Sequence, residues 1–92
     1  MFHALGIVHG DIKTDNIVYS NYFKRPVLID YGLSQVLKQN IDEKTRTHFI
    51  GTLENSCPEM VDLFRTQKQG LVNLYYNDAF AFSRTLVNEP ER

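Results

Sequence analysis

The sequence is poor in the residues that build cross-links and metal centres. Its 92 residues include one cysteine, Cys57, and three histidines. A single cysteine excludes an internal disulfide, and three scattered histidines lack the ligand spacing of a structural zinc site. These absences favour a reducing, intracellular compartment, with the cytoplasm as the default and the nucleus left open.

Excess charge and long apolar runs are also missing. Ten basic residues face eleven acidic ones, for a net charge of -1. This balance argues against a nucleic acid or an anionic membrane as a partner recruited by bulk charge. The longest apolar runs, such as residues 79–82, fall far short of the roughly 18 residues of a membrane span. No basic region followed by an apolar one opens the chain, so we expect neither a span nor a targeting signal.

Two polar motifs follow short apolar runs. The first is His-Gly-Asp-Ile-Lys-Thr-Asp-Asn at residues 9–16, and the second is Asp-Tyr-Gly at residues 30–32. This spacing of aspartate, lysine, asparagine and a second aspartate suits a site that holds a hydroxyl, a phosphoryl group and metal ions together. Phosphoryl transfer depends mainly on positioning and charge neutralisation, with one group to orient the hydroxyl and take its proton. The motifs therefore predict a phosphotransferase catalytic loop.

The two motifs resemble those of the eukaryotic protein kinase family, H-R-D-L-K-x-x-N and D-F-G. The resemblance runs from about Phe2 to Leu86 and covers only the middle of a kinase domain. It implies an α+β fold: part of a C-terminal lobe, mainly helical, with short hairpin strands around the catalytic loop. The implied single partial domain, 1–92, comprises a catalytic loop at 9–16, a metal motif at 30–32, an activation segment at 30–59 and a core helix from about 77.

The resemblance assigns roles to four residues. Asp11 would be the catalytic base, and Lys13 would neutralise charge on the transferred phosphoryl group, as in the serine/threonine class. Asn16 would hold one Mg²⁺ ion, while Asp30 would bridge the ions and face the phosphates of ATP. The implied reaction is transfer of the ATP γ-phosphate to a serine or threonine hydroxyl of a protein substrate. Magnesium and ATP are thus the implied cofactors.

Other positions would support this site. By the resemblance, the His9 ring packs and hydrogen-bonds beneath the metal motif, where a structural role outweighs a catalytic one. Gly32 would permit the turn that aims the metal-motif aspartate. Asp78 would accept backbone N–H groups of the catalytic loop from the start of the last helix; the alternative is a plain helix cap.

The segment from Gly51 to Glu59 resembles the family's G-T-x-x-Y-x-A-P-E. Thr52 would hydrogen-bond near the catalytic aspartate and lysine. Glu59 would be a buried acid that pairs with an arginine much later in a kinase domain. Asn55 stands at the tyrosine position, which puts the substrate-binding wall in doubt.

Two substitutions depart from the common pattern. Gly10 stands where many kinases have an arginine that clamps a phosphorylated activation-loop residue. Tyr31 replaces the usual phenylalanine. Vaccinia-related and casein-kinase-like enzymes are similar at both points. We therefore expect activity not to depend on a loop phosphate, on Thr45 or Thr47, through this contact.

Local patterns predict the elements around the motifs. Residues 33–49 are polar without a sustained period and predict a mobile loop. Pro58 predicts a helix start at Ser56 or Cys57. The remaining expectations are a helix at 1–5 ended by Gly6, strands at 7–8, 17–19 and 27–29 with the last two as a hairpin, and a helix near Asn77 or Asp78, apolar on more than one side.

Two alternatives to an active protein kinase stay open. The five glycines form no G-x-G-x-x-G, and no strand lysine with a helix glutamate precedes the catalytic loop. The isolated chain is therefore expected to be inactive. It is also expected to be only partly folded, because Leu63, Phe64, Phe80 and Phe82 lose neighbours, and it would then be an inert fragment or a pseudokinase-like binding module. Kinases of the aminoglycoside or choline type share His-Gly-Asp, but they generally lack Lys13, the 51–59 pattern and Asp78.

Overall fold

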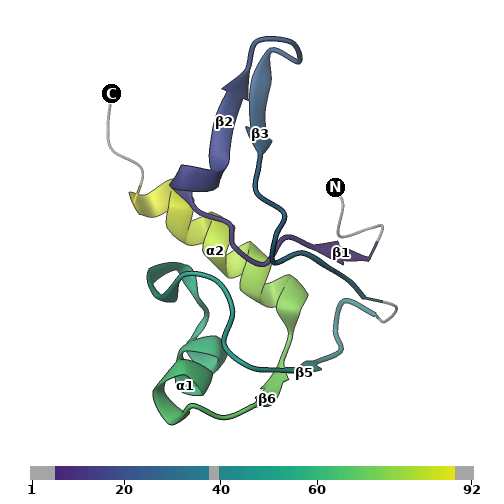
Figure 1. The fold of residues 1–92 in the computed structure, drawn as a ribbon, viewed down its shortest axis with the longest axis vertical. Helices are drawn as coiled ribbons and strands as arrows, with labels where there is room; N and C mark the ends of the chain where they lie inside the picture. The colour runs from purple at the N-terminus through teal and green to yellow at the C-terminus, as the bar shows by residue number, and fades with distance from the viewer. Residues whose placement is uncertain (1–5, 38–39, 89–92) are drawn as a thin grey trace.

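The structure, a computed structural model, describes residues 6–37 and 40–88 (Figure 1). These residues form two α-helices and short antiparallel strands, which confirms the α+β class. The expected helix at residues 1–5 lies outside the described part. The elements are β1 (Ile7–Val8), β2 (Ile17–Ser20), β3 (Arg25–Leu28), β4 (Gln35–Val36), β5 (Thr45–Thr47), α1 (Pro58–Thr66), β6 (Gly70–Val72) and α2 (Leu74–Asn88), with 3-10 turns at Thr14–Asn16 and Leu53–Asn55.

The predicted hairpin is present as the pair β2–β3. Its register places Ile17 opposite Leu28 and Ser20 opposite Arg25. Pro26, which cannot donate to a ladder, is tolerated in this isolated two-stranded sheet. The first strand of the hairpin directly follows the 9–16 segment in sequence. In Figure 1 the hairpin projects away from the two helices.

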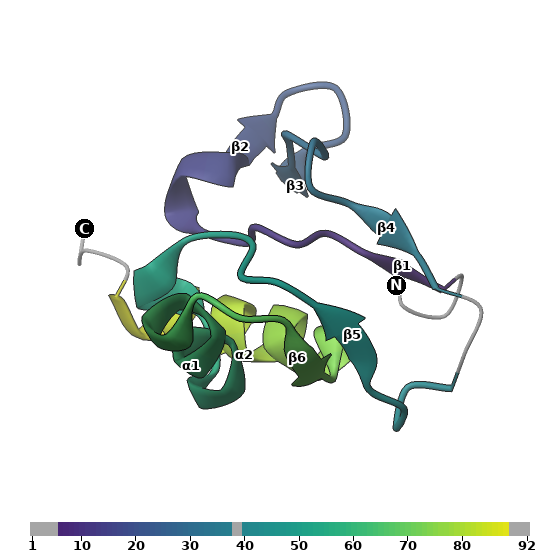
Figure 2. The same cartoon turned by 60° about the horizontal axis from the view of Figure 1, so that its bottom comes forward.

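The prediction of a loop without strands at 33–49 was wrong, because β4 and β5 lie within it. β4 pairs with β1 through Ile7 opposite Val36, and β5 pairs with β6 through Thr45 opposite Val72. Each partner is distant in sequence, so a local hydrophobic period cannot reveal the pairing. Figure 2 shows these two strand pairs along the segment between the metal motif and α1. The segment is therefore fastened at two points.

The first helix begins as the sequence predicts. Pro58 occupies its first turn, where a missing N–H leaves no hydrogen bond unmade, and Cys57 precedes it in an extended conformation. The helix ends at Gln67, which is left-handed with φ 59° and whose N–H donates to Leu63 O at 2.9 Å. Burial raises the pKa of the Cys57 thiol, so this side chain remains a neutral part of the core.

The second helix begins at Leu74, earlier than the predicted Asn77 or Asp78. Asn73 caps it, because its side-chain oxygen accepts the Tyr76 N–H at 3.0 Å. Asp78 therefore lies inside the second turn, and the alternative that it caps the helix is wrong. Since asparagine and aspartate recur at 73, 77 and 78, their capping preference alone could not select the right one.

Only one face of α2 is buried by the described residues. Its buried positions meet the core cluster, which consists of Val8, Cys57, Met60, Val72, Leu74 and Tyr75. Phe82 and Leu86 on another face are 48% and 62% exposed. The helix is therefore apolar on more than one side, but the described residues cover only one of these sides. No helix within 6–37 and 40–88 combines the length and apolarity needed to cross a membrane.

Candidate active site

The 9–16 segment is anchored on α2 by one carboxylate. The His9 N–H donates to Asp78 Oδ2 at 2.7 Å, and the Gly10 N–H donates to Asp78 Oδ1 at 3.0 Å. Asp78 is only 1% exposed, and bonds from N–H groups to an ionised acceptor are among the stronger hydrogen bonds in proteins. The backbone on the N-terminal side of Asp11 is therefore fixed from below by the helix.

The His9 ring connects this segment to the second motif. The Asp11 N–H donates to Nδ1 at 3.1 Å, so Nε2 carries the ring proton and donates to Ile29 O at 2.9 Å. The ring also meets Tyr31 edge to face, with centroids 4.8 Å apart. Both nitrogens of the His9 ring are therefore engaged by backbone groups.

Ile29 connects Asp30 to the 9–16 segment through its backbone. Its N–H donates to Asn16 O at 2.8 Å, while its carbonyl accepts the His9 ring proton. The next residue, Asp30, is left-handed with φ 61°, and its Oδ1 accepts the Gly32 N–H at 3.3 Å. Sequence reasoning did not identify Ile29, because a role performed by backbone groups leaves no side-chain signal.

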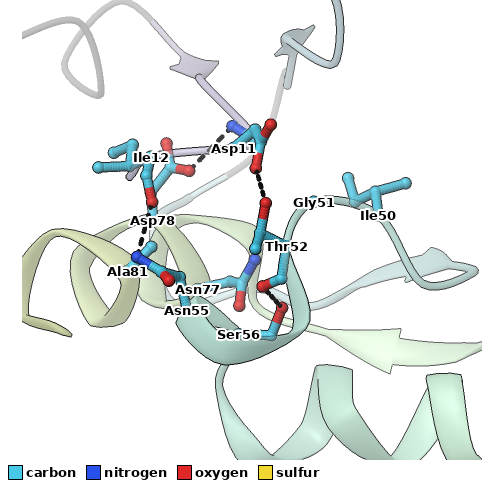
Figure 3. A pocket seen from close by; sticks show the side chains of 11 residues that line it. Asp11, Ile12, Ile50, Gly51, Thr52, Asn55, Ser56, Asn77, Asp78 and Ala81 are labelled. Carbon is cyan, nitrogen blue, oxygen red and sulfur yellow. Dashed lines mark hydrogen bonds between the residues drawn. The ribbon is translucent and has the colours of Figure 1, made fainter. Parts of the chain in front are cut away.

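A threonine from the activation segment joins the aspartate and the lysine of the motif. The Thr52 hydroxyl donates to Asp11 Oδ1 at 2.8 Å and accepts a hydrogen bond from Lys13 Nζ at 3.0 Å. Lys13 Nζ also lies 3.7 Å from Asp11 Oδ2. Figure 3 shows the Thr52 side chain reaching up to Asp11. The three side chains therefore form one charged and hydrogen-bonded group.

Asn16 closes the same group from the other side. Its Nδ2 donates to Asp11 O at 2.9 Å and approaches Asp11 Oδ2 at 3.4 Å. The 3-10 turn places it there, since the Asn16 N–H bonds back to Lys13 O at 2.9 Å. Three of the four residues with predicted chemical roles thus meet directly, and Asp30 is connected to them through Ile29.

Two glycines let backbones come close at this site. Gly51 has φ +95°, and a Cβ there would lie 2.7 Å from Gly10 O. Gly10 has φ +91°, and a Cβ there would lie 2.5 Å from Leu33 O. Both conformations are ones that glycine adopts without strain. The 9–16 segment is therefore in backbone contact with two parts of the activation segment where no side chain fits.

Glu59 does not behave as the resemblance implied. It lies in the first turn of α1 and is exposed among the described residues, so the implied burial is not seen, while its pairing with a much later arginine stays a prediction. A carboxylate is buried only with a compensating partner. Among the described residues, no basic side chain forms an ion pair with Glu59.

Three supporting polar residues were not given these contacts by sequence reasoning. Asn77 Oδ1 accepts the Cys57 N–H at 3.0 Å, and the Ser34 hydroxyl donates to His9 O at 3.1 Å. Asn55 donates to Ile12 O at 3.2 Å. Asn77 is buried, and buried polar groups are normally hydrogen-bonded, but its burial is not readable from the local sequence.

The fold and the linked aspartate, lysine, threonine and asparagine define this chain as part of a protein kinase. It belongs to the protein kinase domain family, which matches residues 1–82. Over 88 residues it is 39% identical to the cell cycle protein kinase spo4 of Schizosaccharomyces pombe, covering 96% of this chain and 17% of that protein.

Other relatives are named as kinases as well. The chain is 36% identical over 61 residues to the serine/threonine-protein kinase US3 homolog of Gallid herpesvirus 2, covering 66% of this chain and 15% of the viral protein. It is 41% identical over 63 residues to ribosomal protein S6 kinase alpha-3 of Mus musculus, covering 65% of this chain and 8% of that kinase. The chain therefore spans less than a fifth of each relative.

Proposed function

We propose that the chain is the central part of the C-terminal lobe of a serine/threonine protein kinase, which transfers the ATP γ-phosphate to a protein hydroxyl. The observation that carries this proposal is the Asp11–Thr52–Lys13 group. A shared threonine hydroxyl holds a carboxylate and an ammonium group side by side. That arrangement pairs an acceptor for the substrate proton with a cation for the transferred phosphoryl group.

Within this proposal each side chain has a task. Asp11 keeps Oδ2 toward Lys13 and Asn16, and one of its oxygens accepts the substrate hydroxyl proton as the hydroxyl attacks. Lys13 balances the charge that develops on the phosphoryl oxygens. Thr52 restrains both groups, so neither has to reorganise during the reaction. Asp78, His9 and the backbone beneath them are positioning elements.

Magnesium fits the residues present. The Asn16 amide hydrogens point at Asp11, which leaves the amide oxygen as the atom for a cation. Asp30 is exposed on its left-handed turn and supplies a carboxylate. Within the described ranges no cluster of three or more His, Cys, Asp or Glu side chains forms a cage. Mg²⁺ does not need one, because it takes one or two protein oxygens and completes its shell with phosphates and water. When bound, it neutralises phosphate charge.

The choice of acceptor separates this function from the small-molecule kinases. We expect the whole protein to transfer labelled phosphate from ATP to serine- and threonine-containing peptides, and not to aminoglycosides or choline. The 51–59 segment favours a peptide acceptor, because kinases of the aminoglycoside or choline type generally lack this pattern. In the structure its Thr52 and Asn55 both bond to the 9–16 segment. Transfer to an aminoglycoside or choline alone would replace the proposal, and no transfer to any acceptor would favour a binding module.

The isolated chain is expected to behave differently from the whole protein. Phe82 and Leu86 remain largely exposed, and each unburied side chain of this kind forgoes about 1.5–3 kcal/mol. We therefore expect the 92-residue polypeptide to be inactive and to lack a sharp thermal transition in circular dichroism. A cooperative transition that moves upward with ATP and magnesium would show that the chain folds and binds nucleotide alone.

A further inference from the structure

Asn55 ends the 3-10 turn that follows Thr52 and occupies the space between the 9–16 segment and α2. Its Nδ2 donates to Ile12 O at 3.2 Å and to Thr85 Oγ1 at 3.3 Å. In Figure 3 its amide points toward Ile12. One amide group therefore connects the activation segment to both the 9–16 segment and α2.

Both partners of this amide are themselves fixed. Thr85 is 2% exposed, and its hydroxyl donates to Ala81 O at 2.8 Å, one helical turn earlier. Since that hydroxyl has one hydrogen, it can only accept from Asn55. Ile12 is buried, so its carbonyl has little access to water as a substitute partner. The bridge therefore transmits the position of α2 to the catalytic segment.

The anchored carbonyl lies at a sensitive place. Ile12 is the residue between Asp11 and Lys13, and the peptide that carries its carbonyl leads directly into Lys13. Lys13 is fully extended, with φ -162° and ψ 166°. A rotation of the preceding peptide would move the Lys13 ammonium group relative to the Asp11 carboxylate, and shifts of about 1 Å at reacting groups reduce rates by up to about 100-fold.

We propose that Asn55 is a positioning residue, which holds the Ile12 carbonyl so that Asp11 and Lys13 keep the geometry for phosphate transfer, with Thr85 as its fixed support. The proposal rests on the function proposed above. It gives a task to the position at which the chain departs from the tyrosine of the family pattern. The asparagine bridges to Ile12 and Thr85 with an amide that a tyrosine does not have.

The test compares near-isosteric variants of the whole protein in a peptide phosphorylation assay. Asn55→Leu should lower kcat about 10-fold, as expected for a small misplacement of reacting groups, and leave the KM for ATP within about twofold. Thr85→Val should lower kcat in the same direction, and Thr85→Ser should restore it because it keeps the hydroxyl. The double variant Asn55→Leu/Thr85→Val should have the same kcat as Asn55→Leu alone, because both changes remove the same hydrogen-bonded bridge.

Hydrogen exchange of the 9–16 amides gives a measurement that does not require activity. We expect Asn55→Leu to increase their exchange while the amides of α1 stay unchanged. If the wild-type protein transfers no phosphate, the proposed function fails, and exchange alone decides the role of Asn55. Unchanged kcat and exchange in Asn55→Leu, or a loss that Thr85→Ser shares with Thr85→Val, would overturn the positioning role.

Discussion

Replacing Asp11 with asparagine in the whole protein should lower kcat for peptide phosphorylation by about 100- to 10,000-fold, the usual contribution of a general base. Asparagine keeps an oxygen for the Thr52 hydroxyl, so the local packing survives. It loses the negative charge beside Lys13 and can no longer take the substrate proton. The KM for ATP should change little, because the main-chain carbonyl of residue 11 still accepts from Asn16.

A second carboxylate provides the control for this substitution. Asp62 lies on α1, is largely exposed, and pairs only loosely with Arg65 at 3.5 Å. Asp62→Asn removes the same charge, and exposed ion pairs contribute about 0–1 kcal/mol, so its kcat should match the wild type. If Asp11→Asn retained more than about a tenth of the wild-type kcat, a general base would have to be sought elsewhere.

The sequence was informative where a residue type is tied to a chemical task. Asp11, Lys13 and Asn16 were identified because their types and spacing suit phosphoryl transfer, and Thr52 was identified from the resemblance of the 51–59 segment to the kinase family pattern. The structure brings these four side chains into contact. Their proposed roles in catalysis and metal binding depend on the measurements described above.

Features that depend on distant partners were harder to predict. β5 pairs with β6 across more than twenty residues, and neither strand has a local alternation that would reveal it. Ile29 acts through its N–H and carbonyl, which every non-proline residue carries. The exposure of Glu59 and of one face of α2 depends on what packs against them, which the local pattern does not contain.

The sequence and the structure give two different reasons for the glycine at position 10. The sequence presents it as the loss of an arginine that would clamp a loop phosphate. The structure adds that its φ of +91° and the nearby Leu33 carbonyl leave no room for any side chain. The activation segment is instead fastened by the β1–β4 and β5–β6 pairs, and the Thr47 hydroxyl is buried and bonded to His48 O at 2.8 Å.

Gly10→Arg, which introduces the residue common in the family, should therefore inactivate the whole protein. A left-handed non-glycine residue costs about 1–3 kcal/mol, and overpacking against Leu33 O adds a further 1–3 kcal/mol or so. The sum, about 2–6 kcal/mol, is a large fraction of the stability of a typical domain. We expect a lower melting temperature and peptide phosphorylation that remains undetectable after treatment with an activating kinase.

Gly10→Ala and Gln69→Arg separate the steric effect of a side chain at position 10 from the effect of an added positive charge. Alanine adds only the Cβ that would meet Leu33 O, so it should reproduce most of the loss of stability. Gln69 is exposed in the linker between α1 and β6, and an arginine there adds the same charge without a clash. Its activity should match the wild type. The opposite result would be an active Gly10→Arg protein that loses activity with phosphatase and regains it when Thr45 or Thr47 is phosphorylated. It would mean that the backbone can rearrange to admit the arginine clamp. It would also mean that strand pairing alone does not hold the activation segment.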